Sequence, residues 1–194
     1  MPNSVGDLGI FAKGYTLAAD RLAGVLLAAP RFSDYEAYPV VFPYRHALEL
    51  SLKHIIYTSA KLAAFKYLGA VEMQLQNTHH LTLLSGTVQA ILARLFPRDE
   101  MLHQTMVVVT ETCREFSEID PRSESYRYPI DRTGQPSSKK HQVVNLRAFA
   151  ERMSSVLEHL DTIRFGLNIE TDMAQGVYET IENLLPSVTK GGEP

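Results

Sequence analysis

The amino-acid sequence predicts an all-α protein, an antiparallel up-and-down helical bundle with a small irregular or β-hairpin insertion before the last long helix. Apolar residues recur every three or four positions over several long stretches, which is typical of amphipathic helices. Short segments rich in proline and glycine separate these stretches. The chain has 194 residues, of which 45% are hydrophobic, so a single core can form. We therefore expect one domain over residues 1–194, with the insertion at about 118–143.

The first two helices are predicted in the N-terminal third of the chain. Apolar residues keep a helical spacing over about 7–29, and Pro30 then blocks continuation of the helix. The segment 31–43 contains two further prolines, so we expect a linking loop there. The second helix is expected over 44–67, with Gly69 as its stop signal.

The third and fourth helices are expected to be shorter. Asn77-Thr78 offers an N-cap for a helix over about 80–95. Asp99 and Glu100 stand where a fourth helix would begin, and acidic residues there complement the helix dipole. The β-branched run at 107–110 makes a strand the competing interpretation, but the helical period persists on both sides of it.

The insertion and the last helices complete the predicted fold. Segments 126–131 and 142–144 are candidates for a short hairpin, because a glycine-containing turn separates them. Asn145 is a suitable cap for the clearest helix, 146–167, which Gly166 or Asn168 would end. A last short helix is expected over 177–185.

Composition excludes several classes of protein. The net charge of −3 argues against bulk electrostatic capture of nucleic acid. A single cysteine, Cys113, excludes a disulfide framework and a CxxC zinc site. No apolar run approaches 20 residues and no basic leader opens the chain, so we expect a cytoplasmic protein without a membrane span. HExxH, P-loop and GxGxxG motifs are absent from the sequence, so we expect no cofactor. His46 and Glu49 lack a second carboxylate pair, and we expect no metal.

One charged stripe stands out in the second helix. Arg45, Glu49 and Lys53 follow one another at intervals of four, which places them on one helical face. Phe42 and Ile56 point in nearly the same direction, so the stripe is expected to be half-buried and to line a pocket or an interface. The alternative is a solvated face held by weak surface pairs.

Two further segments carry candidate chemistry. His80 follows His79 at the start of the third helix, where the dipole keeps an imidazole neutral and suited to act as a base. The alternative there is a capping or packing histidine. Arg127 alternates with two tyrosines and suits bidentate phosphate binding, or it pairs with Asp120 or Asp131 and pins the loop.

Three segments taken together resemble bacterial proteins of the HEPN type (higher eukaryotes and prokaryotes nucleotide-binding). They are Tyr44-Arg45-His46-Ala47-Leu48-Glu49-Leu50-Ser51-Leu52-Lys53, His80-Leu81 with Leu84, and Tyr126-Arg127-Tyr128-Pro129-Ile130-Asp131 before a long helix. The resemblance covers about half of the chain. It implies an all-α bundle that is often dimeric. Members include metal-independent ribonucleases of toxin and defence systems, and inactive relatives that bind nucleotides or partner nucleotidyltransferases.

The resemblance also suggests roles for individual residues. The ribonuclease members share an arginine followed a few residues later by a histidine, and the spacings Arg98–His103 and Arg152–His159 are of this kind. About one such spacing is expected by chance in a chain of this composition. The candidate catalytic residues are His46, His80, Arg98 and His103, and the candidate substrate-binding residues are Arg45, Glu49, Lys53 and Arg127.

Two functions therefore follow from the sequence. The first, implied by the resemblance, is an HEPN-like protein that binds nucleotide or RNA. If it also cleaves RNA, as the metal-independent ribonucleases of toxin and defence systems do, a histidine would act as base and an arginine would stabilise the charged phosphorus centre. The second is a non-catalytic helical interaction module in which the Arg45–Glu49–Lys53 stripe contacts another copy or a partner. In both cases a homodimer is expected, and the first also implies a nucleotidyltransferase-type partner.

Overall fold

The structure is a computed structural model that describes residues 7–66, 78–120, 134–135 and 145–184. Five helices form it: α1 (Asp7–Ala28), α2 (Asp34–Phe65), α3 (Leu81–Leu95), α4 (Glu100–Ile119) and α5 (Leu146–Leu184). No strand occurs in these ranges, so the predicted all-α class is confirmed. The predicted hairpin, with Arg127 in its first segment, lies outside the described residues.

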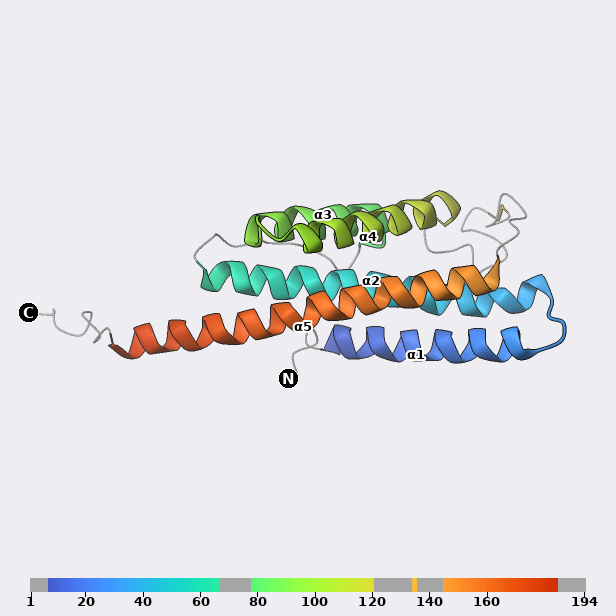
Figure 1. The fold of residues 1–194 in the computed structure, drawn as a ribbon, viewed down its shortest axis with the longest axis horizontal. Coiled ribbons are helices and arrows are strands. Elements are labelled where there is room, and N and C mark those ends of the chain that lie inside the picture. The colour runs from blue at the N-terminus through green and yellow to red at the C-terminus, as the bar shows by residue number, and fades with distance from the viewer. Residues whose placement is uncertain (1–6, 67–77, 121–133, 136–144, 185–194) are drawn as a thin grey trace, which may run out of the picture.

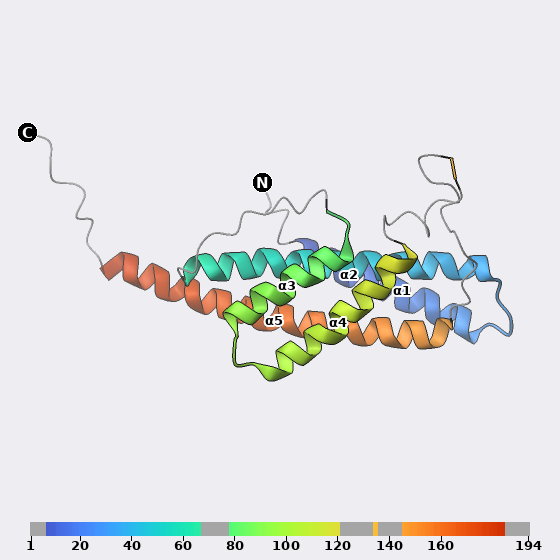
Figure 2. The same ribbon diagram turned by 90° about the horizontal axis from the view of Figure 1, so that it is seen from above.

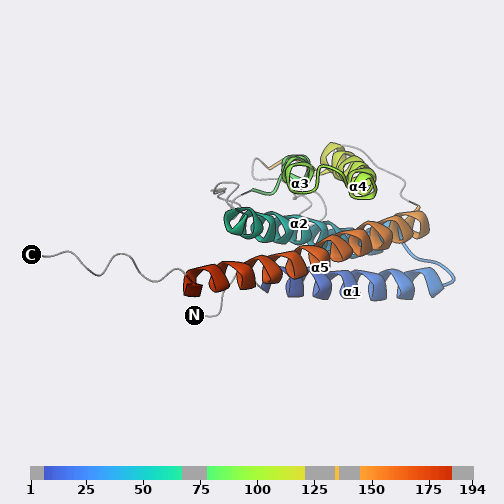
Figure 3. The same cartoon turned by 60° about the vertical axis from the view of Figure 1, so that its left-hand side comes forward.

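The helices form three layers with α2 in the middle (Figures 1 and 3). One side of α2 packs against α1 and α5, and the other side packs against α3. The α3–α4 hairpin crosses the long helices obliquely (Figure 2). In the sequence this hairpin stands between α2 and α5. The α5 helix starts at the same end of the bundle as α2, so it runs in the same direction as α2 and antiparallel to α1 (Figure 1).

The core follows the central position of α2. The buried apolar residues of α2 include Val40, Leu48, Leu52, Ile55 and Leu62. Each of the other helices contributes its own apolar stripe to the same cluster. Because α2 has neighbours on two sides, its buried face is wide, and this explains why charged residues within it are also taken out of water.

The prediction of a loop over 31–43 is wrong, because α2 begins at Asp34 and continues through Pro39 and Pro43. The backbone N–H of Ser33 donates to Glu36 Oε2 at 2.6 Å, which satisfies one of the free donors at the start of the helix. Val40 is fully buried between the two prolines. Burial of this turn in the core offsets the backbone hydrogen bonds that the prolines remove.

The prediction that the last long helix ends near Leu167 is also wrong, because α5 continues without a break to Leu184. Leu167 is buried at the expected end of the helix, and Thr171 is buried beyond it. Farther along, Gln175 accepts a hydrogen bond from Lys61 of α2 at 3.2 Å. Packing against α2 therefore carries the helix past Gly166 and Asn168, whose low helix propensity is a weak effect by comparison.

The remaining helices lie close to their predicted bounds. The α3 helix starts at Leu81 with His80 as its N-cap, rather than with the predicted Asn77-Thr78 cap. The Asp99 carboxylate caps α4 by accepting from the Leu102 N–H at 2.9 Å. The strand alternative for 107–110 is wrong, because this run lies in the middle of α4. Asn145 caps α5 as expected, through a 3.1 Å hydrogen bond from the Ala148 N–H.

Candidate functional site

The predicted charged stripe of α2 lies inside the protein. Arg45, Glu49 and Lys53 are only 1%, 2% and 6% exposed. Arg45 Nη1 lies 3.1 Å from Glu49 Oε2, and Lys53 Nζ lies 2.9 Å from Glu49 Oε1. A stripe with this helical spacing is thus held together by one central carboxylate between two cations. The expectation of half-burial was therefore too modest, and the solvated-face alternative is wrong.

Two residues from other parts of the chain complete this group. Asp120, just after α4, lies 3.4 Å from Arg45 Nε, and His79, just before α3, places Nδ1 2.9 Å from Glu49 Oε1. The carbonyl of His79 also accepts from Arg45 Nη2 at 2.9 Å. We call Arg45, Glu49, Lys53, His79 and Asp120 the buried charge cluster. It ties α2 to the chain segments entering α3 and leaving α4.

The electrostatics of the buried charge cluster favour the ionised carboxylate. Burial alone would raise the pKa of Glu49, but the hydrogen bond and charge of Lys53 and, after them, the contact with His79 outweigh it and lower the pKa. Two cations and two carboxylates face one another, so the formal charges balance. In contrast, burial raises the pKa of the nearby Cys113 thiol to about 12, which makes this cysteine unreactive.

His79 is the one member of the cluster that solvent reaches. Its side chain is 56% exposed, whereas the Glu49 side chain is 3% exposed. A buried carboxylate that accepts a hydrogen bond from one imidazole nitrogen fixes the orientation of the ring. The Glu49–His79 pair therefore holds an exposed imidazole in a fixed orientation, next to Arg45, whose Nη2 donates to the His79 carbonyl.

The other predicted site residues are not part of this cluster. His46 is half-buried and packs its ring edge-to-face on Tyr15 of α1, with centroids 4.5 Å apart. His80 is exposed and makes no side-chain capping bond. Arg98 is exposed before α4, and His103 is half-buried beside a cavity of about 330 Å³ between α3 and α4. These four residues do not assemble into one catalytic centre.

The second arginine–histidine spacing does not form a pair either. Arg152 of α5 lies 3.0 Å from Glu115 of α4, an ion pair that joins the two helices. His159 is exposed on α5. The spacing is accounted for by helix packing, in line with its expected chance frequency.

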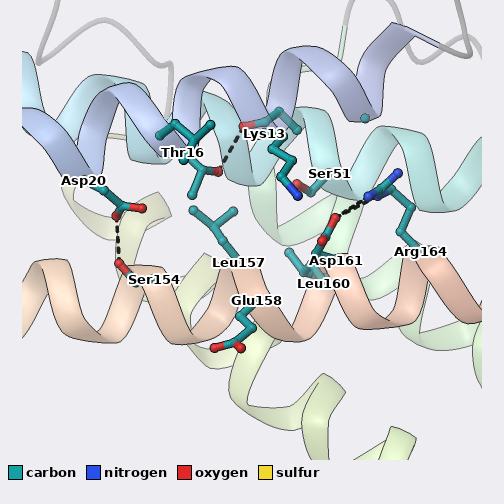
Figure 4. Close-up of a pocket in the computed structure, with 13 residues that line it drawn as sticks. Lys13, Thr16, Asp20, Ser51, Ser154, Leu157, Glu158, Leu160, Asp161 and Arg164 are labelled. Carbon is teal, nitrogen blue, oxygen red and sulfur yellow. Dashed lines mark hydrogen bonds and ion pairs between the residues drawn. The ribbon is translucent and has the colours of Figure 1, made fainter.

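A second group of polar residues lines a pocket between α1 and α5 (Figure 4). At one end Asp20 Oδ1 accepts two hydrogen bonds, from Tyr44 Oη at 2.6 Å and from Ser154 Oγ at 2.9 Å. Burial, followed by the hydrogen bond to Asp20, raises the pKa of Tyr44 to about 12. At the other end Arg164 Nε donates to Asp161 Oδ1 at 3.0 Å. Lys13 and Ser51 also line this end (Figure 4).

Sequence reasoning missed several of these residues. His79 was considered only together with its neighbour, and nothing in the local pattern separates the two. Lys13 and Asp20 are seven residues apart on one helical face, a signal that could have been noticed. That they line one pocket with Arg164 depends on how α1 packs against α5, which no local pattern encodes.

The outer face of α1 is apolar and exposed. Its large side chains remain accessible at 71% for Ile10, 59% for Phe11, 48% for Leu17, 41% for Leu22 and 69% for Val25. In Figures 1 and 3, α1 forms the edge of the molecule opposite α3 and α4, and no other helix covers its outer side. Exposed large apolar side chains gathered on one helix are a common feature of interaction surfaces.

Comparison of the chain with protein-family models, curated proteins and solved structures finds no match. Among the residues that the structure describes, no three histidine, cysteine or acidic side chains gather as a metal site would require. Nor does any helix in this part of the chain have both the length and the apolar character needed to cross a membrane.

Proposed function

We propose that the protein is a non-catalytic helical interaction module that associates through the outer face of α1, with a second copy of the chain as its partner. The observation that carries this proposal is the composition of α1, which is apolar on two opposite sides. Its inner side buries three alanines, Ala12, Ala19 and Ala23, against the bundle. Its outer side presents larger apolar residues to solvent.

This distribution favours association because a helix needs only one apolar face to pack on its own domain. The small inner residues let α1 approach α2 closely, so the larger residues are not required for the core. Arg21 is the one charged residue among the outer apolar positions. Burying this face against another protein therefore requires little desolvation of charge.

The area of the outer face fits a modest dimer interface. The exposed parts of its five large side chains amount to about 100 Å² each, so a symmetric pair would bury on the order of 1,000 Å². That value is at the lower limit of specific interfaces. A second copy is favoured as the partner because one apolar helix face is self-complementary about a two-fold axis.

The charged stripe has a different role in this proposal than in the sequence-based hypothesis. Arg45 and Glu49 are paired inside the chain and are inaccessible to a partner. The stripe holds the bundle together, and the apolar face of α1 makes the contact.

Sedimentation equilibrium of the Val25→Glu variant tests this proposal. The wild type is expected to be dimeric, and the variant to dissociate with a Kd raised at least about 100-fold, because a buried unpaired charge is costly. Val107→Glu is the matched control, because it makes the same change at a 60% exposed position of α4. A monomeric wild type would refute the proposal. Dissociation by Val107→Glu alone would move the interface to α4.

A second candidate function is that of the HEPN-like proteins, binding of nucleotide or RNA with metal-independent cleavage. The observation that favours it is the Glu49–His79 pair, in which a buried carboxylate orients an exposed imidazole at 2.9 Å. In such a reaction His79 would remove the proton of a ribose 2′-hydroxyl. Arg45 is buried and engaged, so phosphate binding would need other cations.

Neighbouring histidines give this second candidate a sharp test. RNA cleavage in the presence of a chelator is measured for wild type, His79→Ala and His80→Ala. If the candidate is correct, the His79 variant loses activity by about 100-fold or more and the His80 variant keeps it. Equal activity of the two variants, or no binding and cleavage by the wild type, would exclude the Glu49–His79 pair as the site.

A further inference from the structure

The pocket between α1 and α5 carries an inference that is independent of the association through α1 (Figure 4). It has a volume of about 290 Å³ and lies between α1 and α5, with Leu17 as the one residue that it shares with the outer apolar face. From its geometry we propose that it binds a small zwitterion whose ammonium and carboxylate groups are separated by a short hydrocarbon chain.

The end of the pocket near the start of α1 suits the anionic group. Lys13 lines it, and its ammonium has no hydrogen bond or ion pair to any residue in the described ranges. The Arg164 guanidinium lies at the same end and is paired with Asp161 (Figure 4). Two cations and one carboxylate leave a net positive charge there. The Ser51 hydroxyl adds a neutral hydrogen-bonding group.

The opposite end of the pocket suits the ammonium group. The Asp20 carboxylate accepts both of its hydrogen bonds, from Tyr44 and Ser154, on Oδ1. Its Oδ2 atom accepts none from the residues that the structure describes and is available for a charged donor. Tyr44 and Ser154 fix the carboxylate in place, so little ordering is required when a ligand binds.

The distance between the two ends sets the length of the ligand. Lys13 and Asp20 are seven residues apart on α1, which corresponds to about 10 Å along the helix axis. If the two charged side chains keep the spacing of their Cα atoms, two charge-assisted hydrogen bonds of about 2.8 Å each leave roughly 5 Å between the charged groups of the ligand. An extended chain of four covalent bonds spans about this distance. This length corresponds to a γ-amino acid.

The middle of the pocket is apolar, as a hydrocarbon chain requires. Leu157 and Leu160 of α5 and Ala12 and Leu17 of α1 line the pocket, and the hydroxyl of Thr16, which also lines it, donates to the carbonyl of Ala12. Glu158 of α5 also lines the pocket, and in Figure 4 its side chain points away from α1. The arrangement of charge, hydrocarbon and charge therefore matches the ligand class from one end to the other.

Calorimetric titration with γ-aminobutyrate as the probe tests the proposal. Butyrate and n-butylamine are the matched probes, since each keeps the hydrocarbon and one charged group. γ-Aminobutyrate is expected to bind at least about tenfold more tightly than either. Equal affinities for the three probes, or no heat with γ-aminobutyrate up to millimolar concentration, would overturn the proposal.

Two variants locate the binding site. Lys13→Met removes the free cation at an exposed position and is expected to weaken γ-aminobutyrate binding at least about tenfold. Arg147→Met removes a cation from an exposed position at the start of α5 and is expected to leave binding unchanged. Circular dichroism confirms that both are folded. An equal loss in the two variants would show that the attraction is not located in the pocket and would overturn the proposal.

Discussion

The buried charge cluster and the α1–α5 pocket contain similar charged side chains. The cluster pairs all of them within the chain, whereas the pocket leaves one cation without a partner in the described ranges. In the cluster, Glu49 is shared by Arg45, Lys53 and His79, and its two oxygens are both engaged. In the pocket, Lys13 has no partner in the described ranges. One group uses its charges to connect chain segments, whereas the other keeps charge accessible.

The difference is explained by the position of the helices. The cluster lies on α2, which has neighbours on two sides, so each of its charges must find a partner within the chain. The pocket lies between α1 and α5, and its Lys13 is exposed, so water solvates the charge that the protein leaves unpaired. Similar residue types therefore stabilise the fold in the cluster, and in the pocket they leave the Lys13 ammonium available to a ligand. Substitutions in the cluster should therefore lower the free energy of unfolding strongly, whereas substitutions of the exposed pocket charges should change ligand affinity with little effect on stability.

The largest expected effect is that of Glu49→Ala. This change leaves Arg45 and Lys53 buried without their shared carboxylate, and removing one partner from a buried ion pair costs about 3–5 kcal/mol. The free energy of unfolding is measured in urea. Glu158→Ala, an exposed glutamate of α5, is the control and should leave the unfolding midpoint unchanged. A small effect of Glu49→Ala would mean that the cluster is solvated.

A smaller loss is expected when acid protonates the same carboxylate. The pKa of Glu49 is lowered in the folded protein, so its contribution is present above the ordinary glutamate pKa of 4.5 and is lost as the pH falls through the lowered value. The free energy of unfolding of the wild type should therefore decrease in acid more steeply than that of Glu49→Gln. Parallel pH profiles of the two proteins would contradict the assigned pKa shift.

Tyr44→Phe tests the polar end of the pocket. It removes the 2.6 Å hydrogen bond to Asp20 but keeps the ring in the core, so the expected cost is about 1–2 kcal/mol. Ser154 still donates to Asp20 in the variant. Tyr35→Phe, at a 70% exposed ring, is the control for loss of a hydroxyl in urea unfolding. If both variants were equally stable, the hydrogen bond to Asp20 would contribute nothing.

Local sequence patterns predicted most of the fold but failed where tertiary packing overrides propensity. The bounds of α1, α3 and α4 follow from periodicity and from capping residues such as Asp99. The N-terminal extension of α2 was missed because Pro39 and Pro43 were given more weight than Ser33-Asp34-Tyr35-Glu36, which has the spacing of a capping box. The length of α5 depends on contacts with α2 that become visible only once the helices are packed.

The residues of the buried charge cluster were predicted only in part, because local patterns give the face of a helix but not the packing of distant segments. Arg45, Glu49 and Lys53 share a face by helical geometry alone, so their association was predictable. The choice of His79 rather than His80 depends on how the chain enters α3, a matter of one residue in register. His46 lies one residue from Arg45 but is rotated by about 100°, which directs it to α1 instead.

The smallest expected effect on stability is that of Asp161→Asn, and it separates the two regions most clearly. Asp161 and Arg164 form a partly exposed pair on one helix, so the substitution should cost less than about 1 kcal/mol in urea unfolding. The same change removes the one carboxylate at the cationic end of the pocket, so γ-aminobutyrate should bind the variant more tightly than the wild type. Weaker binding would mean that Asp161 itself contacts the ligand, and a large loss of stability would mean that this pair is as essential as those of Glu49.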